Sequence, residues 1–170
     1  MRRRLPFPPL WLFADAVRVP DLEAAVAALP RRLCGLVFRP EGYPPGMSLT
    51  ATRACRRYGV RLVVASGAVP PGAGRHLRRG YGKACGDFAT SSAHGRAEAV
   101  RARRAGATLV FLSPVFPTRS HPGAPALLPQ RWLRAASRGG WTAALGGIDG
   151  RNIRRLPAAA AVGAIGALLP

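Results

Sequence analysis

The chain has 170 residues, of which 48% are hydrophobic, and its formal charge at pH 7 is +19. This length suits one domain with one core, which we expect to span residues 1–170, and the hydrophobic fraction excludes a chain that is disordered throughout. No apolar run reaches the roughly 18 residues that a membrane-spanning helix needs, so we expect a cytoplasmic protein that does not contact membranes.

The positive charge comes almost entirely from arginine, since Lys83 is the only lysine among 26 basic residues. Guanidinium groups suit phosphate and nucleic acid. A chain rich in Ala, Gly, Pro and Arg with almost no Lys is also typical of GC-rich coding, and we favour that explanation for the arginine excess. Phosphorylated ligands agree with either explanation.

Cysteine and histidine do not indicate a metal site. The cysteines Cys34, Cys55 and Cys85 are odd in number and far apart, so we expect buried thiols in a reducing compartment. The three histidines are scattered, and we predict no metal ligands among them. His76 stands among arginines, which predicts an exposed side chain.

The first elements in chain order alternate between strand and helix. Residues 10–14 are apolar on both faces, as in a covered parallel strand, and prolines before them argue against a signal peptide. A helix is predicted at 21–29, with Asp21 and Glu23 in its first turn. Strand 34–38 follows, and Ser48 is predicted to cap a helix that ends at Tyr58 before Gly59.

The alternation continues to the end of the chain. Strands are predicted at 61–65, 74–77, 88–91, 108–112, 142–145 and 161–165, and helices at 96–105, 130–137 and 152–156. This order predicts an α/β fold, a compact (β/α)8 TIM barrel with shortened helices and no final helix, because such barrels usually take about 250 residues. An open flavodoxin-like sheet is the alternative.

Ligands of such barrels bind at the loops that follow the strands. The sixth predicted strand is followed by residues 113–123, which hold three hydroxyls, one Arg and one His. The seventh is followed by Gly146 and Gly147, and the eighth by Ile165 and Gly166. Backbone N–H groups at glycine-rich turns bind anions, so these last loops predict a phosphate site.

The segment 90–147 resembles the second half of the thiamine phosphate synthase and thiazole tautomerase family. The shared motifs are Ser92-Ala-His94 before a helix, Ala-Gly-Ala at 105–107, Pro-Val-Phe-Pro-Thr at 114–118, and the Gly146-Gly147 turn. The resemblance implies a barrel that joins an aminopyrimidine diphosphate to a thiazole phosphate and releases pyrophosphate. The partners it implies are therefore small phosphorylated substrates.

The resemblance also implies roles for individual residues. Arg39 would grip the diphosphate, Ser92 would face the pyrimidine, and His121 stands where the family has a loop lysine. The phosphate set is carried over by position as Thr118, Ser120, Gly146, Gly147, Ile165 and Gly166.

The chain departs from the family at the metal site. The family uses Mg²⁺ held by aspartates after strands three and four, but no Asp or Glu lies between Glu41 and Asp87. Ser66 is a poor substitute, because Mg²⁺ prefers carboxylate and water. A relocated site at Asp15 and Glu41 is conceivable, but we predict no metal ligands, and the sequence leaves open whether catalysis survives.

Two alternatives remain beside a synthase or a degenerate member that only binds these phosphates. One is a metal-independent thiazole tautomerase with His94 or His121 as acid and base. The other is an Arg-rich nucleic-acid-binding module, which we do not expect, because the arginines spread over several predicted helices. The sequence leaves a homodimer open.

Overall fold

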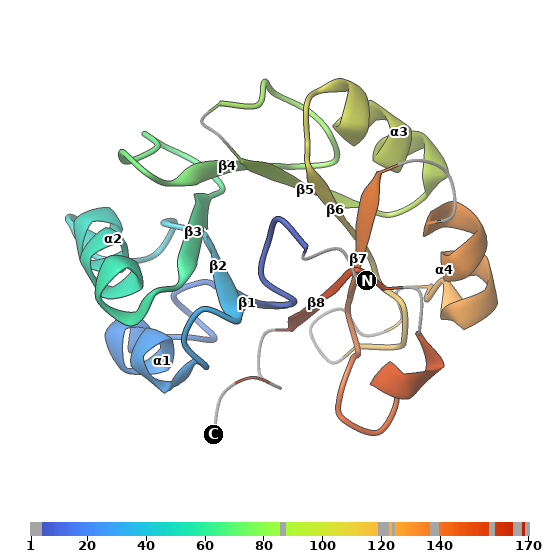
Figure 1. Cartoon of the computed structure of the whole chain (residues 1–170), viewed down its shortest axis with the longest axis horizontal. Coiled ribbons are helices and arrows are strands. Elements are labelled where there is room, and N and C mark those ends of the chain that lie inside the picture. The colour runs from blue at the N-terminus through green and yellow to red at the C-terminus, as the bar shows by residue number, and fades with distance from the viewer. Residues whose placement is uncertain are drawn as a thin grey trace.

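The protein, seen in a computed structural model, forms a closed barrel of parallel strands (Figure 1). The structure describes residues 5–85, 88–118, 123, 125–136, 140–156, 159–164 and 168. The strands are β1 (Leu10–Ala14), β2 (Cys34–Phe38), β3 (Arg61–Val64), β4 (Gly74–Leu77), β5 (Ala89–Ala93), β6 (Leu109–Leu112), β7 (Trp141–Leu145) and β8 (Ala161–Ala164). Each strand pairs with the next, and β1 pairs with β8, with Leu10 opposite Val162. The predicted barrel is confirmed, and the open sheet is wrong.

The helices lie where the sequence predicts them, with one difference at a cap. They are α1 (Leu22–Ala28), α2 (Met47–Tyr58), α3 (Arg96–Arg104) and α4 (Leu128–Ala136), with a 3-10 turn, η1 (Ile153–Arg155), before β8. Asp21 caps α1 by accepting a hydrogen bond from the Ala24 N–H at 3.0 Å. Ser48 does not cap α2, because the helix begins one residue earlier, after Gly46 in the left-handed conformation.

The helices that surround the strands are shorter than those of an ordinary (β/α)8 barrel. Helices α1 and α2 lie together on one side of the barrel, and α3 and α4 lie on the opposite side (Figure 1). The connection from β3 to β4, residues 65–73, contains no helix. Shortened helices are therefore confirmed, while the final helix was predicted absent for residues 165–170, of which only Leu168 is described. No described helix is long and apolar enough to cross a membrane.

Aromatic rings fill the inside of the barrel. Trp11, Phe13 and Phe111 are buried, and the rings of Phe13 and Phe111 meet edge to face with centroids 4.9 Å apart. Gly35 makes room for the Trp11 indole, since a Cβ there would lie 2.5 Å from it. The inside of the barrel is thus occupied by side chains, so we expect ligands at the loops at one end, as in other barrels of this fold.

The cysteines divide into two kinds. Cys34 and Cys55 are buried, as predicted, and burial raises the pKa of the Cys55 thiol to about 12. Cys85 is exposed, so the prediction of a buried thiol is wrong there. Cys85 lies in the connection between β4 and β5, whereas Cys34 lies in β2 and Cys55 lies in α2.

Candidate binding site at the carboxyl ends of the strands

The loops that follow β6 and β7 are joined by backbone hydrogen bonds. The N–H of Val115 donates to the carbonyl of Leu145 at 3.0 Å, and the N–H of Phe116 donates to that of Gly146 at 3.1 Å. The β6 loop begins at the cis peptide bond between Ser113 and Pro114. Two of the three loops that the sequence assigned to phosphate binding therefore form one surface.

The turn after β7 depends on its two glycines. Gly146 and Gly147 have φ values of 91° and 67°, which favour glycine. A Cβ on Gly147 would also lie 2.7 Å from the carbonyl oxygen of Phe116. Within the described part of the chain, the N–H groups of these two glycines donate to no other residue. They are therefore available to an anion.

A polar turn at residues 149–152 is hydrogen-bonded to the second of the two glycines. The Asp149 carboxylate accepts hydrogen bonds from the N–H groups of Arg151 and Asn152, both at 2.9 Å. The Asn152 side chain in turn donates to the carbonyl of Gly147 at 2.8 Å. Asp149 is thus engaged in shaping the loop and is not set up as a metal ligand.

The rest of the predicted phosphate set lies partly outside the described residues. Thr118 is half-buried and follows Pro117, whose carbonyl oxygen lies beside Gly147. Ser120, His121, Ile165 and Gly166 lie outside the described residues. Thr118 therefore follows a residue that lies at the glycine turn, and its role in phosphate binding stays a prediction, like the roles of the other four residues.

Arg39 lies on the opposite side of the barrel mouth, directly after β2. Its N–H donates to the carbonyl of Ala14 at 3.0 Å, and its guanidinium carbon lies 5.9 Å from the centroid of the Phe13 ring. The side chain is half-buried, and this burial lowers the pKa of its guanidinium. No described residue makes an ion pair or hydrogen bond with that guanidinium.

The nearby carboxylates have partners of their own. Asp15 lies 3.2 Å from the Arg18 guanidinium. The Ser66 hydroxyl donates to Glu41 at 2.5 Å, and this bond is the main reason that the pKa of the Glu41 carboxyl falls below its ordinary value.

These residues do not fit a magnesium ion. Strands β3 and β4 are followed by Ser66 and Arg78 at the mouth, and a guanidinium cannot coordinate a cation. No group of three His, Cys, Asp or Glu side chains among the described residues could hold a metal ion. The mechanism proposed below therefore uses no metal.

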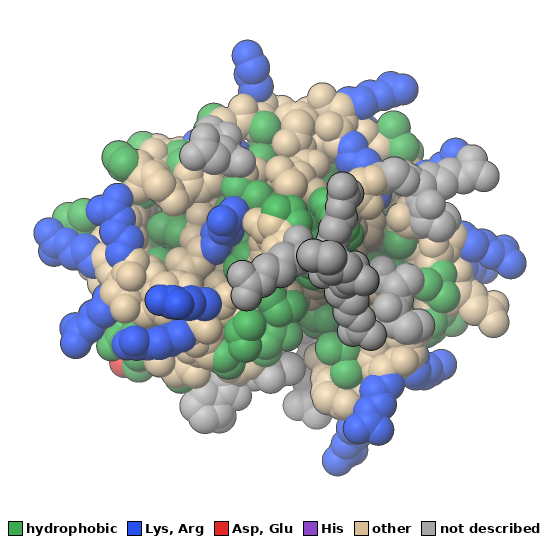
Figure 2. Space-filling model, in the orientation of Figure 1, with side chains coloured by type: hydrophobic (Ala, Val, Ile, Leu, Met, Phe, Trp, Pro, Cys, Tyr) green, Lys and Arg blue, Asp and Glu red, His purple; other side chains and the backbone are tan. Residues whose placement is uncertain are grey.

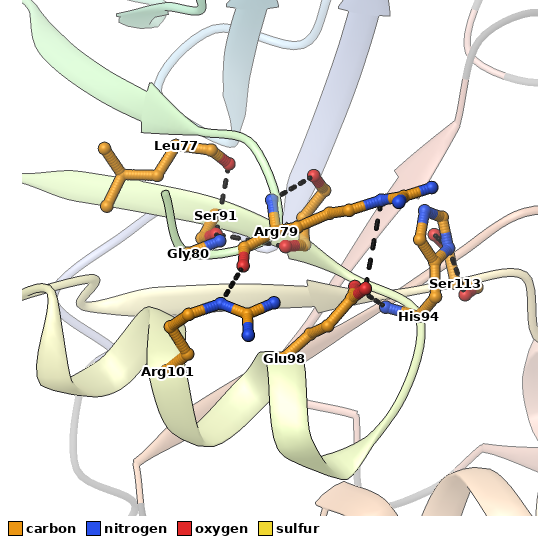
Figure 3. Close-up of polar contacts among 9 residues, drawn as sticks. Leu77, Arg79, Gly80, Ser91, His94, Glu98, Arg101 and Ser113 are labelled. Atoms are coloured by element: carbon orange, nitrogen blue, oxygen red, sulfur yellow. Dashed lines mark hydrogen bonds and ion pairs between the residues drawn. The ribbon is translucent and has the colours of Figure 1, made fainter. Parts of the chain in front are cut away.

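Ser92 and His94, at the end of β5, belong to a polar network (Figure 3). The Ser92 hydroxyl accepts a hydrogen bond from the N–H of Arg79 at 3.4 Å. His94 places Nδ1 2.9 Å from the carbonyl oxygen of Ser113, which can only accept. In the neutral ring this puts the proton on Nδ1 and leaves Nε2 as an acceptor.

Helix α3 holds this network in place. The Glu98 carboxylate accepts from the N–H of His94 at 2.8 Å and lies 3.9 Å from the Arg79 guanidinium. Arg101 donates to the carbonyl of Arg79 at 2.9 Å (Figure 3). The turn after β4 is thereby fixed against β5.

His76 is buried, so the prediction of an exposed side chain is wrong. It is only 3% exposed, its Nδ1 lies 2.7 Å from the Thr90 hydroxyl, and its ring meets that of Phe13 edge to face. Burial, together with the charge of Arg39, lowers the pKa of the imidazole to about 3. The alternation of strand 74–77 places His76 on the same face as Gly74, but it does not specify that this face lies inside the barrel.

Residues 86–167 match the family model described as thiamine monophosphate synthase. No curated protein sequence matches the chain.

Solved structures show the same fold. A thiamine phosphate pyrophosphorylase from Pyrococcus furiosus superposes with a TM-score of 0.72 at 18% identity, covering 92% of this chain and 84% of that one. A native KDPGal structure gives 0.58 at 16% identity, covering 96% of this chain and 84% of that one. FabK from Thermotoga maritima gives 0.63 at 18% identity, covering 92% of this chain and 57% of that one.

Proposed function

The second half of this chain, residues 86–167, belongs to the thiamine monophosphate synthase family, and on that premise we propose that the protein binds the phosphorylated substrates of thiamine phosphate formation. In its active form it joins an aminopyrimidine diphosphate to a thiazole phosphate and releases pyrophosphate. In a degenerate form it only binds these phosphates. Such water-soluble substrates agree with a cytoplasmic protein.

One observation carries the proposal: the β6 and β7 loops are bonded to each other, with Gly146 and Gly147 at the junction. Their N–H groups and the Thr118 hydroxyl would receive the thiazole phosphate. Ser120, Ile165 and Gly166 would complete this site, and His121 would follow it in the same loop. Backbone donors suit a phosphate because they are held in place before the ligand arrives.

The other substrate would lie across the mouth. Ser92 would face the pyrimidine, and Arg39 would hold the diphosphate. The reaction that the family resemblance implies is dissociative, so the protein's work is to position two anions and to stabilise the departing diphosphate. Each of these tasks uses charge and hydrogen bonds and needs no side-chain nucleophile.

Calorimetry with thiamine phosphate tests the binding proposal. We expect binding in the micromolar range, and no heat at millimolar ligand would refute the proposal. Rescue of a thiamine auxotroph that lacks the synthase then separates the active form from the degenerate one. Rescue that is lost in Arg39→Ala would support a transferase.

His94 favours one second candidate, a thiazole tautomerase. Its Nδ1 faces a carbonyl, which leaves Nε2 as a proton acceptor beside the mouth. Such a reaction moves a proton and needs no metal, which suits this donor set. A tautomerisation rate that is unchanged in His94→Ala and in His121→Ala would exclude it.

The surface does not favour the nucleic-acid-binding alternative. On the face that Figure 2 presents, Lys and Arg side chains lie at the top, right and bottom as well as in a denser group on the left, so they do not form one continuous patch. A nucleic-acid site needs a contiguous basic surface. Tight binding of RNA or DNA at physiological salt would reverse this ranking.

A further inference from the structure

Two arginines stand at the mouth where strands β2 and β4 end. Arg39 directly follows β2, and Arg78 directly follows β4. Parallel strands of a barrel end at the same rim, so both residues lie on the edge where Gly146 and Gly147 also lie. Burial is the main reason that the pKa of Arg39 is lowered, and the charge of Arg78 adds to this effect.

The Phe13 ring links these two strand ends inside the barrel. Its centroid lies 5.9 Å from the Arg39 guanidinium carbon and 5.6 Å from the centroid of the His76 ring. His76 lies on β4, two residues before Arg78, which follows the strand. Arg39 and β4 therefore share one neighbour, the Phe13 ring.

The protein offers Arg39 only distant counter-charges, because the carboxylates of Asp15 and Glu41 raise its pKa but form no ion pair with it. Asp15 is paired with Arg18, and Glu41 holds the Ser66 hydroxyl. Among the described residues, no carboxylate lies in an ion pair with Arg39 or Arg78. Arg39 is half-buried, whereas Arg78 is exposed. A half-buried guanidinium without an ion-pair partner is unfavourable, so a bound anion would lower the cost of burying Arg39.

A second polar group beneath the arginines also lacks a partner. The Nε2 atom of His76 is buried and makes no hydrogen bond to any described residue. The imidazole is neutral at physiological pH, because its pKa is about 3. The mouth thus holds two permanent positive charges above a neutral polar ring, a combination that favours a multiply charged anion over a cation.

We propose that Arg39 and Arg78 bind a diphosphate group directly, with no divalent cation between protein and ligand. A guanidinium presents a planar fork of N–H donors that matches phosphate oxygens, and two of them supply the charge that a metal ion would otherwise supply. The identity of the ligand rests on the proposed function. The existence of an anion site on this side of the mouth rests on Arg39, Arg78 and His76.

Calorimetry with inorganic pyrophosphate, in EDTA and in Mg²⁺ at physiological salt, tests the proposal. We expect binding in EDTA, with a Kd within about twofold of that in Mg²⁺. Arg39→Ala and Arg78→Ala should each weaken binding by about tenfold or more, because each removes charge-assisted hydrogen bonds. Arg78→Lys keeps the charge without the fork and should fall between wild type and Arg78→Ala.

The control is Arg53→Ala, which removes the same charge from an exposed position on α2. It should change the Kd by less than about twofold, since Arg53 lies within a helix and does not follow a strand at the mouth, and salt screens its charge. Pyrophosphate binding that appears only with Mg²⁺ would overturn the proposal. So would an Arg78→Ala variant that binds as well as Arg53→Ala.

The outcome is separable from that of the proposed function. Metal-free pyrophosphate binding without thiamine phosphate binding would support the arginine site and refute the proposed function. Thiamine phosphate binding with strictly Mg²⁺-dependent pyrophosphate binding would do the reverse. Arg39→Lys should keep part of the affinity, so a folding defect in Arg39→Ala would not hide the result.

Discussion

The two sides of the barrel mouth are built from different chemistry. On the β6–β7 side, backbone hydrogen bonds and two left-handed glycines shape the surface. On the β2–β4 side, side chains decide the character of the surface: Arg39, Arg78 and the buried His76. The family model matches residues 86–167. This range includes the β6–β7 side and begins after β2 and β4.

This difference shows which part of a site tolerates change. A backbone donor stays in place as long as the loop keeps its shape, so the loop must keep its glycines and prolines. A charged side chain can be exchanged residue by residue while the strand beneath it is unchanged.

Gly147→Ala should disrupt the backbone side most strongly. The new Cβ would meet the Phe116 carbonyl, and φ at this position is +67°. We expect a loss of about 2 to 4 kcal/mol in the free energy of unfolding, measured in urea, because overpacking and left-handed strain add. Thiamine phosphate binding should be lost as well.

Gly150→Ala is the matched control on the same loop. A Cβ on Gly150 has no atom within 4 Å, and its φ is outside the left-handed range. Its stability should stay within about 1 kcal/mol of wild type. Equal effects of the two substitutions would contradict the special role of the Gly147 turn.

Lowering the pH should destabilise the protein, because His76, on the β2–β4 side of the mouth, is buried in its neutral form. Its pKa is about 3 in the folded protein and 6.5 ordinarily, so the unfolded chain binds the proton first. Stability is therefore complete above pH 6.5 and falls as the pH drops toward 3, by up to about 1.4 kcal/mol per pH unit. Urea unfolding of the wild type should show a loss of roughly 2 kcal/mol from pH 6.5 to about 5.

His76→Gln carries no titrating group and should show a flatter profile in that range. Glu41 does not interfere, because its folded pKa lies below 4.5 and its contribution is lost only under more acidic conditions. A wild-type stability that does not change between pH 6.5 and about 5 would contradict the burial of a neutral imidazole.

Glu98→Gln should loosen the link between the two sides. Glu98 holds the N–H of His94 and faces Arg79, so it ties the turn after β4 to the end of β5. We expect a loss of about 0.5 to 1 kcal/mol, measured by thermal unfolding, since the bond resembles a helix-capping contact. Glu23→Gln, in the first turn of α1, should have a smaller effect; a larger one would refute the link.

Ser66→Ala should have the smallest effect on stability, about 0.5 kcal/mol, because the bond is exposed. Its clear consequence is electrostatic. Ser66 is the main cause of the lowered pKa of Glu41, so the pKa should rise toward 4.5 when the hydroxyl is removed. Carboxyl NMR titration measures this directly, and an unchanged Glu41 pKa would show that another group sets it.

The predicted phosphate loops illustrate what a local motif can and cannot reveal. Gly146 and Gly147 could be found from sequence, because paired glycines after an apolar strand already limit the backbone. The environment of His76 could not, since its burial depends on Phe13 and Phe111, which come from distant strands. No feature of the sequence distinguishes Arg78 from the many other arginines.

The order of strands and helices, the glycine turns and the absence of carboxylates after the third and fourth strands could all be predicted from the sequence. These features depend on neighbouring residues, so apolar period, caps and turns reveal them. The tertiary structure decided that β1 closes on β8, that His76 is buried and neutral, and that Glu41 reaches Ser66, 25 residues away. These outcomes depend on which strands, far apart in the sequence, lie next to each other, and a local sequence pattern does not specify that.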